Sequence, residues 1–569
     1  MNKFKSQNEL AFRKKKKRWH PKGRQTDDIS INEINIILKD LKIIREELIE
    51  YLHLIQDKFG TLYERHLAAL AEIMKIPLAE VFEVATFYAH FEISKDKDTV
   101  KEVTVRVCEN LTCEMFGSKE LFKKLSSLNN HSINLVPGPC MGRCHQAPTV
   151  CVGKNYVDNA NLEKVLKTID SKDFKAKLPK YINLEEYKLK GGYKILQQIL
   201  EKKISKENII EIVKKSNLKG KGGAGFPTYK KWEFVLSNPG PRYLTINADE
   251  GEVGTFKDRH YLEKDPHRFL EGVLISAKII DAKEIYIYLR DEYPAALQIL
   301  NLEIENLIKN NFLKKNYIKI RRGAGAYICG EESAMIESIE GKRGLPRHRP
   351  PYVASIGLFG QPTLVNNVET VYWLKDIIEK GHSWYSDQGK NGRKGFHSFS
   401  VSGRVKKPGV KIAPAGITVQ ELIDDYSGGM LDGHEFKGYL PGGASGGILP
   451  SSLNNIPLDY GSDDLTKEGC FLGSAAIVIF SDKDSIMDVG LNLLKFFEEE
   501  SCGQCTPCRV GTEKTVKIMK QKIWNKEKLE DLSEVMASAS ICGLGQAATN
   551  PLKSIIKYFS NEITFESHD

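Results

Sequence analysis

The sequence has no long hydrophobic run. No apolar stretch among its 569 residues approaches the roughly 20 residues that a helix needs to cross a bilayer. The start of the chain also lacks the apolar segment of a secretory signal peptide. These absences argue against a membrane-spanning or secreted protein, and we expect a cytoplasmic chain without a membrane span.

The chain also has little net charge outside one short segment. The formal net charge is +9, and the run of basic residues from Arg13 to Arg18 contributes six of these charges. The rest of the chain is nearly balanced, which does not favour nucleic-acid binding. We expect residues 1–30 to form a basic disordered tail, with docking to a partner as a further use.

Size and composition indicate a multidomain globular protein. With 41% hydrophobic and 28% charged residues, the chain is long enough for about four domains, each with its own core. Apolar residues recur at helical spacing from Ile31 to about Phe91, whereas Val103 to Val107 alternates as a strand. Strands and helices then alternate, and the chain is helical again from about Asp484. We therefore expect a multidomain α/β protein.

Four of the 11 cysteines lie near the C-terminus with an informative spacing. Cys502, Cys505 and Cys508 follow one another with two-residue gaps, and Cys542 lies far downstream. Such gaps let one tight turn hold three corners of a cubane cluster, and a remote cysteine can supply the fourth ligand. Zinc sites usually take paired C-x-x-C motifs, so the pattern favours a [4Fe–4S] cluster over structural zinc or a disulfide pair.

A second set of four cysteines lies in the first third of the chain. Cys108 and Cys113 are spaced C-x4-C, and Cys140 and Cys144 are spaced C-x3-C. This spacing fits no standard zinc finger, whereas four thiolates on two loops suit a [2Fe–2S] cluster. Cluster thiolates need a reducing compartment, which agrees with a cytoplasmic location.

The other three cysteines have apolar or glycine-rich neighbours. Free cysteine in such a setting is most often a small buried hydrophobe. We therefore assign no chemistry to Cys151, Cys329 and Cys470.

A glycine-rich segment after residue 219 matches G-x-G-x-x-G. The dinucleotide fingerprint should follow a strand, but residues 209–218 are expected to form a helix, so this is not a standard Rossmann turn. Consecutive glycines still let backbone N–H groups approach a phosphate, and Lys231 lies nearby to add charge. A glycine-rich hinge is the alternative. The glycines are Gly220, Gly222, Gly223 and Gly225.

Two further segments bring acids to places where a ligand would bind. One directly follows the predicted strand 243–246, and the other ends a glycine-rich stretch that starts at Gly323. Ligands of α/β folds bind at the carboxyl ends of strands. Acids there would repel phosphate, so we expect them to hydrogen-bond ribityl or ribose hydroxyls. The residues are Asn247, Asp249, Glu250, Gly330, Glu331 and Glu332.

Together these motifs resemble a known family of redox proteins. Residues 205–569 are similar to the NADH-binding flavoprotein subunit of respiratory complex I, and residues 31–170 to its thioredoxin-like [2Fe–2S] partner subunit. Their fusion in this order most resembles the β subunit of molybdenum- or tungsten-dependent, NAD-linked formate dehydrogenase. The strings that carry this closer resemblance are Pro21 to Gln25, Ala85 to Phe91, Ser402 to Lys406 and Leu440 to Pro450.

The resemblance implies roles for the residues above and for further ones. FMN would be held by the glycine loop with Lys231, by both acid segments and by a later asparagine pair. NAD would stack beside two phenylalanines, with Glu252 as the catalytic residue next to the nicotinamide and the reactive face of the flavin. The additional FMN residues are Asn366, Asn367 and Thr370, and the additional NAD residues are Phe226, Phe234, Arg349 and Tyr352.

Some positions depart from the family pattern. Val253 stands where the family commonly has proline, and Arg349 to Tyr352 replaces a Lys-Pro-Pro-Phe segment. Arginine is a planar fork and lysine a point charge, so we expect nucleotide affinity to differ. The stretch between Cys113 and Cys140 is also shorter than in most relatives, and we expect a trimmed loop that retains the cluster.

The resemblance implies an order of domains as well. The expected parts are a basic tail (1–30), an N-terminal helical bundle (31–95), a thioredoxin-like [2Fe–2S] domain (96–170), a linker (171–204), an FMN- and NAD-binding α/β domain (205–397), a β-grasp domain (398–482) and a helical [4Fe–4S] domain (483–569).

The implied function is that of a diaphorase. Hydride transfer moves two electrons at once and iron–sulfur clusters carry one, so a flavin must stand between them. The partner would be a formate-oxidising molybdenum- or tungsten-pterin α subunit with further clusters; the alternative is the NADH-oxidising input module of complex I or of an NAD-linked hydrogenase. A zinc scaffold or nucleic-acid-binding protein would leave the glycine and acid segments unexplained.

Overall fold

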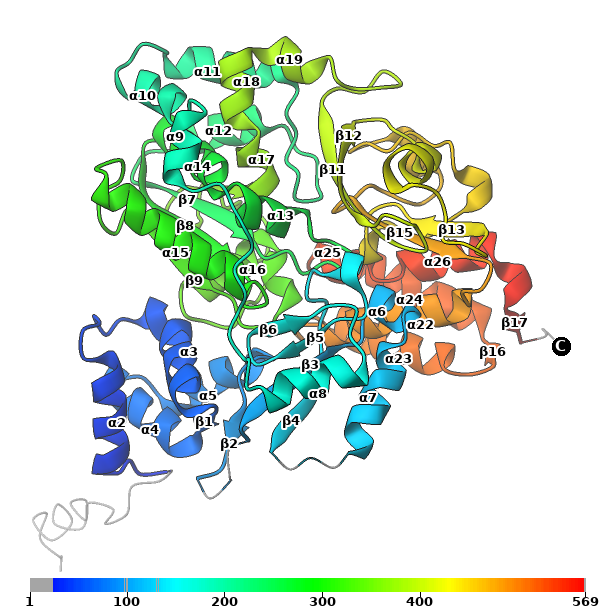
Figure 1. Cartoon of the computed structure of the whole chain (residues 1–569), viewed down its shortest axis with the longest axis horizontal. Helices are drawn as coiled ribbons and strands as arrows, with labels where there is room; N and C mark the ends of the chain where they lie inside the picture. The colour runs from blue at the N-terminus through cyan, green and yellow to red at the C-terminus, as the bar shows by residue number, and fades with distance from the viewer. Residues whose placement is uncertain (1–23, 97, 99–100, 129, 131, 567–569) are drawn as a thin grey trace, which may run out of the picture. The chain divides into compact units, whose positions relative to one another are not determined.

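The computed structural model describes residues 24–96, 98, 101–128, 130 and 132–566 (Figure 1). They form two compact units, one within residues 1–86 and 91–100 and the other within residues 87–90 and 101–569. The basic run and most of the predicted tail, including Pro21, Lys22 and Gly23, lie outside the described residues.

The first unit is mainly helical. Asp27 caps its first helix by accepting the N–H of Ser30 at 2.8 Å, and Gly60 ends another helix with a φ of 76°. Leu48, Leu52 and Ile55 are buried, as their helical spacing predicts. The elements are α2 (Asp28–Leu38), α3 (Leu48–Phe59), β1 (Leu62–Tyr63), α4 (Glu64–Met74), α5 (Leu78–Phe87) and β2 (Ile93–Ser94), with β1 and β2 parallel.

In the second unit, a four-stranded sheet carries the first cysteine set. Its order is β4-β3-β5-β6, with β3 parallel to β4 and antiparallel to β5. Val105 and Val107 of the alternating strand pack in a core with Leu121 and Leu125. The elements are β3 (Val103–Cys108), α6 (Leu111–Met115), α7 (Ser118–Ser127), β4 (Ile133–Gly138), β5 (Val150–Val152), β6 (Asn155–Val157) and α8 (Leu162–Asp170).

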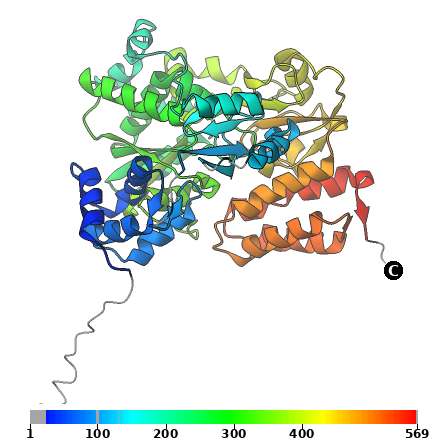
Figure 2. The same ribbon diagram turned by 60° about the horizontal axis from the view of Figure 1, so that its bottom comes forward.

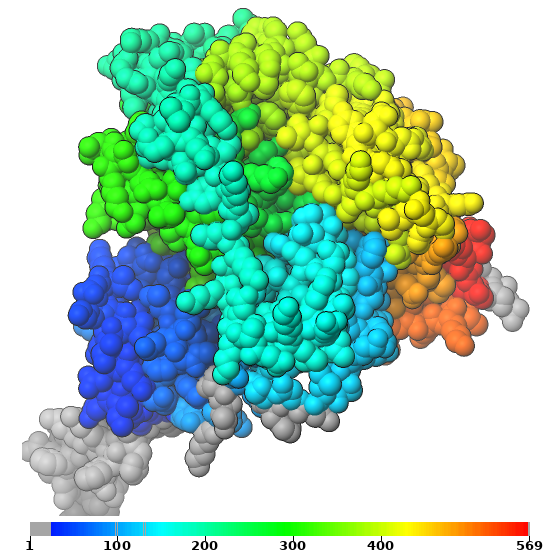
Figure 3. All heavy atoms as spheres, viewed as in Figure 1, coloured from blue at the N-terminus to red at the C-terminus, as the bar shows by residue number. Residues whose placement is uncertain are grey.

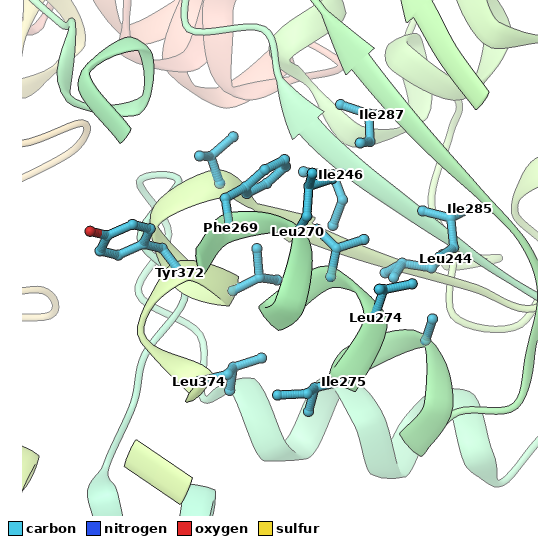
Figure 4. Close-up of a cluster of buried hydrophobic side chains, with 14 of the residues drawn as sticks. Leu244, Ile246, Phe269, Leu270, Leu274, Ile275, Ile285, Ile287, Tyr372 and Leu374 are labelled. Atoms are coloured by element: carbon cyan, nitrogen blue, oxygen red, sulfur yellow. The ribbon is translucent and has the colours of Figure 1, made fainter. Parts of the chain in front are cut away.

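A fully parallel sheet with the order β10-β7-β8-β9 forms the next domain. Figure 4 shows Phe269, Leu270 and Leu274 of the covering helix α14 directed toward Leu244 and Ile246 of the sheet. Helices cover such sheets, which agrees with the burial of most residues in the central strands β7 and β8. The elements are β7 (Arg242–Ala248), α13 (Lys257–Lys264), α14 (Pro266–Ile279), β8 (Ala282–Leu289), α15 (Pro294–Lys309), β9 (Ile318–Arg322), α16 (Glu332–Ile339), β10 (Thr363–Asn367), α17 (Val368–Tyr372) and α18 (Leu374–Lys380).

The linker predicted over residues 171–204 is wrong for its second half. Helices α9 (Leu184–Leu189) and α10 (Lys194–Leu200) lie there, and their apolar side chains belong to the same core as α14. The hydroxyl of Tyr187 donates to buried Glu271 of α14 at 2.6 Å. High lysine content concealed a short apolar face, because lysines on the opposite face of each helix stay in solvent.

The following region contains a mixed five-stranded sheet with the order β12-β11-β15-β13-β14. Strands β11 and β15 are parallel, and the other pairs are antiparallel. The expected strand-rich character is therefore present, and the β-grasp assignment stays a prediction. The strands are β11 (Phe396–Gly403), β12 (Gly409–Pro414), β13 (Phe436–Leu440), β14 (Leu449–Pro450) and β15 (Ala476–Ser481).

The C-terminal part is helical and carries the second cysteine set. Figure 2 shows its helices side by side in orange and red. Within the described residues, no helix is both long enough and apolar enough to cross a membrane. The elements are α22 (Ile486–Glu499), α23 (Thr506–Met519), β16 (Ile523–Trp524), α24 (Lys526–Ala539), α25 (Gly543–Ala547), α26 (Asn550–Tyr558) and β17 (Thr564–Phe565).

The domain with the first cysteine set packs against later parts of the second unit (Figure 3). Arg404, just after β11, donates from Nη2 to the carbonyl of Met115 at 2.9 Å. Asn492 of α22 donates from Nδ2 to the carbonyl of Glu109 at 2.9 Å. The chain therefore brings its two cysteine-bearing domains into one unit with the parallel sheet.

The contact between α14 and α17 should be sensitive to one methyl group. A Cβ added to Gly272 would lie 1.9 Å from the carbonyl oxygen of Val371, so Gly272→Ala must push the helices apart. Overpacking of this kind costs about 1–3 kcal/mol. We expect a lower apparent unfolding temperature for the variant in a thermal scan. Lys278→Ala at the end of the same helix is the control, and an equal loss in both variants would contradict the steric explanation.

Candidate functional site

The first cysteine set forms one buried group of sulfurs. Cys108 ends β3, opposite Gly138 at the end of the parallel neighbour β4, so the two cysteine loops leave the sheet at the same edge. The Sγ atoms of Cys140 and Cys144 are 3.5 Å apart. The pKa of Cys113 is raised well above its usual value by its hydrogen bond with Cys108 and by burial. Such thiols would lose their protons to solvent on binding iron, and four cysteines on two neighbouring loops fit a [2Fe–2S] cluster.

The second cysteine set lines a single cavity. Cys505 and Cys542 occupy the N-cap positions of α23 and α25, where backbone N–H groups favour a thiolate. Burial raises the pKa of Cys508 and of Cys542 to about 11. Four sulfurs around one apolar cavity fit a [4Fe–4S] cluster. The lining residues are Ile328, Pro346, Ser501, Cys502, Gln504, Cys505, Cys508, Ile541, Cys542 and Leu544.

The three cysteines without assigned chemistry are buried. Burial raises the pKa of Cys151 and Cys329 to about 12 and that of Cys470 to about 11. Their burial agrees with the expected role as small apolar side chains.

The segments expected to bind flavin meet at the carboxyl edge of the parallel sheet. Asn247 of β7 lies opposite Asn367 of β10. The backbone N–H of Lys221 donates to Oγ1 of Thr370, and Nδ2 of Asn247 donates to the carbonyl of Gly330, both at 2.8 Å. The glycine loop, both acid segments and the start of α17 thus surround one place, which we call the cradle.

The glycine loop is held in a defined shape. Gly220 donates its N–H to the carbonyl of Phe226 at 2.8 Å, which closes the loop just before α12 (Thr228–Leu236). Gly223 and Gly225 have φ values of 121° and 63°, a region that favours glycine. A Cβ on Gly225 would also lie 2.5 Å from that of Tyr460. A loop closed and packed in this way has a fixed shape, which argues against the hinge alternative and leaves its binding role a prediction.

Two buried polar atoms in the cradle lack a partner among the described residues. They are Oδ2 of Asp249 and Nδ2 of Asn366. An unpaired buried polar atom costs about 1–3 kcal/mol, so a ligand with several hydrogen-bonding groups would stabilise this site. A Cβ on Gly222 would lie only 3.2 Å from the Cβ of Asn367, so the glycine loop and the end of β10 approach each other closely. The ribityl chain and ring of FMN have the groups that this donor and acceptor set requires.

The carboxylate of Glu250 accepts hydrogen bonds from other groups of the protein. It accepts the N–H groups of Asp258 at 2.8 Å and Arg259 at 3.1 Å, and the hydroxyl of Tyr293 at 2.9 Å. Burial raises its pKa to about 7. Its side chain therefore anchors the start of α13, a role that the sequence did not indicate.

Four charged residues predicted for cofactor binding form a cluster. Glu331 caps α16 by accepting two backbone N–H groups at 2.9 and 3.0 Å, and it pairs with Arg349. Glu332 lies 3.1 Å from Nη2 of Arg349 and 3.8 Å from Nζ of Lys231. The two cations offset the two acids, so the cluster does not repel a phosphate as the acids alone would.

The aromatic residues expected at the nucleotide site are unusually exposed. Phe226 and Phe234 are 38% and 54% exposed, with ring centroids 6.2 Å apart, and Tyr352 is 60% exposed. Large apolar side chains grouped at a surface indicate a contact site for another molecule.

Two residues around Glu252 were not predicted as site residues. Oε1 of Glu252 accepts the N–H and the hydroxyl of Ser445 at 2.7 and 2.8 Å, and Oε2 accepts the hydroxyl of Tyr327. Burial raises the pKa of Glu252. Ser445 lies in the string 440–450 and Tyr327 in the second glycine-rich segment. Both segments stand out in the sequence, but which side chains face Glu252 is decided by the fold.

The side chain of Lys221 ties the glycine loop to strand β11, which the sequence also did not indicate. Its Nζ lies 2.8 Å from Nδ1 of His397 and donates to the carbonyl of Phe396 at 2.6 Å. His397 in turn pairs with Asp459 at 2.8 Å. Burial lowers the pKa of Lys221 to about 8 and that of His397 to about 4.

The buried lysine should make stability depend on alkaline pH. The pKa of about 8 in the folded chain lies below the value near 10.4 of an unfolded lysine, so the unfolded chain binds more protons between these values. The free energy of unfolding should therefore rise over this range. We expect the melting temperature of wild type, relative to that of Lys221→Met, to increase as the pH rises from about 8 to about 10. Lys230→Met removes an exposed lysine as the control, and a constant difference for Lys221→Met would contradict this explanation.

Three family models match the chain. They are the Nuo51 FMN-binding domain over residues 213–376, the thioredoxin-like [2Fe-2S] ferredoxin over residues 34–173 and the NADH-ubiquinone oxidoreductase-F iron-sulfur binding region over residues 488–566. The predicted FMN, NAD, [2Fe–2S] and [4Fe–4S] cofactors and the predicted fold class are thereby confirmed.

Individual relatives match over most of their own length. An F subunit of the NADH-quinone oxidoreductase of Rhizobium meliloti (strain 1021) is 40% identical over 394 residues, 67% of this chain and 93% of the relative. The corresponding F subunit of Aquifex aeolicus (strain VF5) is 43% identical over 403 residues, 68% of this chain and 92% of the relative. A structure of NAD+-reducing [NiFe]-hydrogenase in the H2-reduced state aligns with a TM-score of 0.80 and 28% identity, covering 93% of this chain and 94% of that chain. The chain therefore belongs to the family of NADH-quinone oxidoreductase F subunits, which are NAD-linked flavin and iron–sulfur oxidoreductases.

Proposed function

We propose that this chain is a diaphorase module that exchanges electrons between NAD(H) and a partner subunit. FMN, when bound, exchanges electron pairs with NAD(H) and single electrons with iron–sulfur clusters. The chain's own residues bind and orient these groups and keep water out of a buried site.

The observation that carries this proposal is a set of buried and partly buried contacts joining the cradle to both cysteine sets. The N–H of Tyr327 donates at 2.9 Å to Glu500, two residues before the first C-terminal cysteine. On the other side, the carbonyl of Glu250 accepts a hydrogen bond from Arg290, which also donates to the carbonyl of Cys140. A nucleotide site in contact with two cluster sites is the arrangement that a diaphorase needs.

The proposed site residues follow this division. Glu252, held by Ser445 and Tyr327, borders the nicotinamide and the reactive face of the flavin as the catalytic residue. The cluster ligands are the two cysteine sets described above. For FMN we propose Gly220, Gly222, Gly223, Gly225, Lys231, Asn247, Asp249, Gly330, Glu331, Glu332, Asn366, Asn367 and Thr370, and for NAD we propose Phe226, Phe234, Arg349 and Tyr352. The role of Glu250 is indirect, because its carboxylate is engaged by α13 and Tyr293.

As the partner we propose a formate-oxidising molybdenum- or tungsten-pterin subunit with further clusters. The support is the fusion of both cysteine-bearing domains with the flavin domain in one chain, in the order that resembles formate dehydrogenase β subunits. The NADH-quinone oxidoreductase relatives match only 67–68% of this chain, so the fusion sets it apart from them. We propose the reducing cytoplasm as its location, since cluster thiolates are stable there.

A hydrogen-oxidising nickel–iron subunit is the second candidate partner. The NAD+-reducing [NiFe]-hydrogenase structure covers 93% of this chain, so its likeness extends over the fused domains as well. NADH input into a complex I-type membrane arm is a further alternative with the same chemistry on this chain.

Loss of one C-terminal cysteine should affect one cluster only. We expect anaerobically prepared Cys505→Ala to lose between about one and four iron atoms per chain, because one iron of the cubane loses its protein ligand. Iron and acid-labile sulfide assays measure this. Cys470→Ala removes a buried cysteine outside both sets and should keep the wild-type iron content; equal iron in the two variants would refute the ligand assignment.

The isolated chain should show diaphorase activity alone. We expect NADH-dependent reduction of an artificial electron acceptor by the anaerobically purified holoprotein, with no oxidation of formate or hydrogen. Formate oxidation without any partner would refute the proposed division of labour.

The metal content of the purified assembly distinguishes the candidate partner subunits. Native mass spectrometry and metal analysis of the co-purified assembly should find molybdenum or tungsten if the partner oxidises formate. Nickel would favour the hydrogenase alternative, and a membrane-extracted assembly would favour the complex I alternative. Either of the last two results would overturn the formate proposal while leaving the diaphorase proposal intact.

A further inference from the structure

Arg290 is a buried cation between the cradle and the first cysteine set. It follows the last residue of β8 and is 3% exposed. Its Nη1 donates to the carbonyl of Glu250 at 2.5 Å, and its Nη2 donates to the carbonyl of Cys140 at 2.7 Å. One guanidinium therefore holds both the acid segment of the cradle and a residue of the [2Fe–2S] ligand loop.

The carboxylate that pairs directly with Arg290 is that of Glu292, and Asp249 acts on the same guanidinium without a direct hydrogen bond. Glu292 accepts from Nη2 at 2.7 Å and from Nε at 3.1 Å, and it is also buried. In a buried setting a charge acts more strongly on its neighbours than in water. The guanidinium contacts Cys140 directly, whereas Glu292 contacts the guanidinium, so the two charges act on the cluster site with opposite signs.

Other contacts hold the same ligand loop in place. Nε of Arg259 donates to the carbonyl of Gly142 at 2.9 Å. A Cβ on Gly142 would lie 2.3 Å from the hydroxyl oxygen of Tyr293, so that ring packs directly on the loop. The same hydroxyl donates to Glu250. The loop is thus fixed against the cradle at several points, and Arg290 is the contact that brings a cation to a cluster ligand.

We propose that Arg290 is a positioning residue that raises the reduction potential of the [2Fe–2S] cluster and couples that potential to the cradle. Reduction adds one electron, and hence one negative charge, beside Cys140, and the neighbouring guanidinium stabilises this charge. Because the same guanidinium holds Glu250, a change at the cradle that moves it changes the potential, and the coupling is reciprocal. The inference rests on the proposed [2Fe–2S] ligand set.

Two variants with opposite expected effects test this inference. In a potentiometric titration of the anaerobic holoprotein with dithionite, followed by EPR, we expect Arg290→Met to lower the ratio of reduced to oxidised [2Fe–2S] cluster at a fixed potential. The expected change is at least tenfold, which is about 59 mV for one electron. Glu292→Gln should shift the ratio in the opposite direction, because it removes the balancing negative charge. The [4Fe–4S] signal in the same samples should not move.

Arg404→Met is the matched control. Arg404 also carries a carboxylate partner, Asp484, and also donates to a backbone carbonyl of the cysteine-bearing domain, but not to a cluster ligand. We expect it to leave the [2Fe–2S] potential within a twofold change in ratio. If Arg290→Met does not fold, the direction of the Glu292→Gln shift decides.

Three results would overturn the inference. They are an unchanged potential in a folded Arg290→Met or in Glu292→Gln, shifts of the same sign in these two variants, and a shift in Arg404→Met as large as that in Arg290→Met. A wild-type holoprotein without a [2Fe–2S] signal would instead refute the ligand assignment, and the inference with it.

Discussion

The site depends on the parallel direction of the strands in the sheet β10-β7-β8-β9. Because parallel strands end at the same edge, the residues that follow them converge even though they are far apart in the chain. Asn247 and Asp249 come from the end of β7, Arg290 from the end of β8 and Asn366 from the end of β10. Without this shared edge, neither the cradle nor its contact with the first cysteine set would exist.

The buried polar groups at that edge are of two kinds, those with hydrogen-bond partners in the protein and those without. Glu250, Arg290 and Lys221 are buried charges whose partners lie within the protein, and such paired groups fix the geometry of the loops that carry them. Asp249 and Asn366 each keep one polar atom without a partner among the described residues. The paired groups fix the loops of the cradle, and the unpaired atoms are polar groups that a ligand could satisfy.

Fusion places several redox sites in one polypeptide. Two proteins that meet by diffusion lose translational and rotational freedom, whereas linked domains meet at a high effective concentration. Here that advantage is combined with direct contacts, such as Arg404 to Met115 and Asn492 to Glu109, which hold the first cysteine domain against later domains. Modest contacts are sufficient because the covalent chain already brings the domains together.

Some features of this protein could be predicted from the spacing of residues that lie close together in the sequence. The two-residue gaps between Cys502, Cys505 and Cys508 allow one turn of the chain to hold three cluster ligands, so the sequence alone identified cluster chemistry there. The α/β class and the position of Asn247 and Asp249 at the carboxyl end of β7 also followed from patterns within a few residues. The residues that surround Glu252 did not follow from any local pattern.

The sequence by itself determined the two iron–sulfur clusters, because they are expressed in the spacing of cysteines, whereas FMN and NAD followed from the resemblance to a known family. The tertiary structure alone decided which side chains meet. Ser445 and Tyr327 reach Glu252 from 193 and 75 residues away, and the side chain of Lys221 turns from its glycine loop toward His397. Such contacts depend on strand register and on burial, which oblige each buried polar group to find a partner that no spacing along the chain reveals.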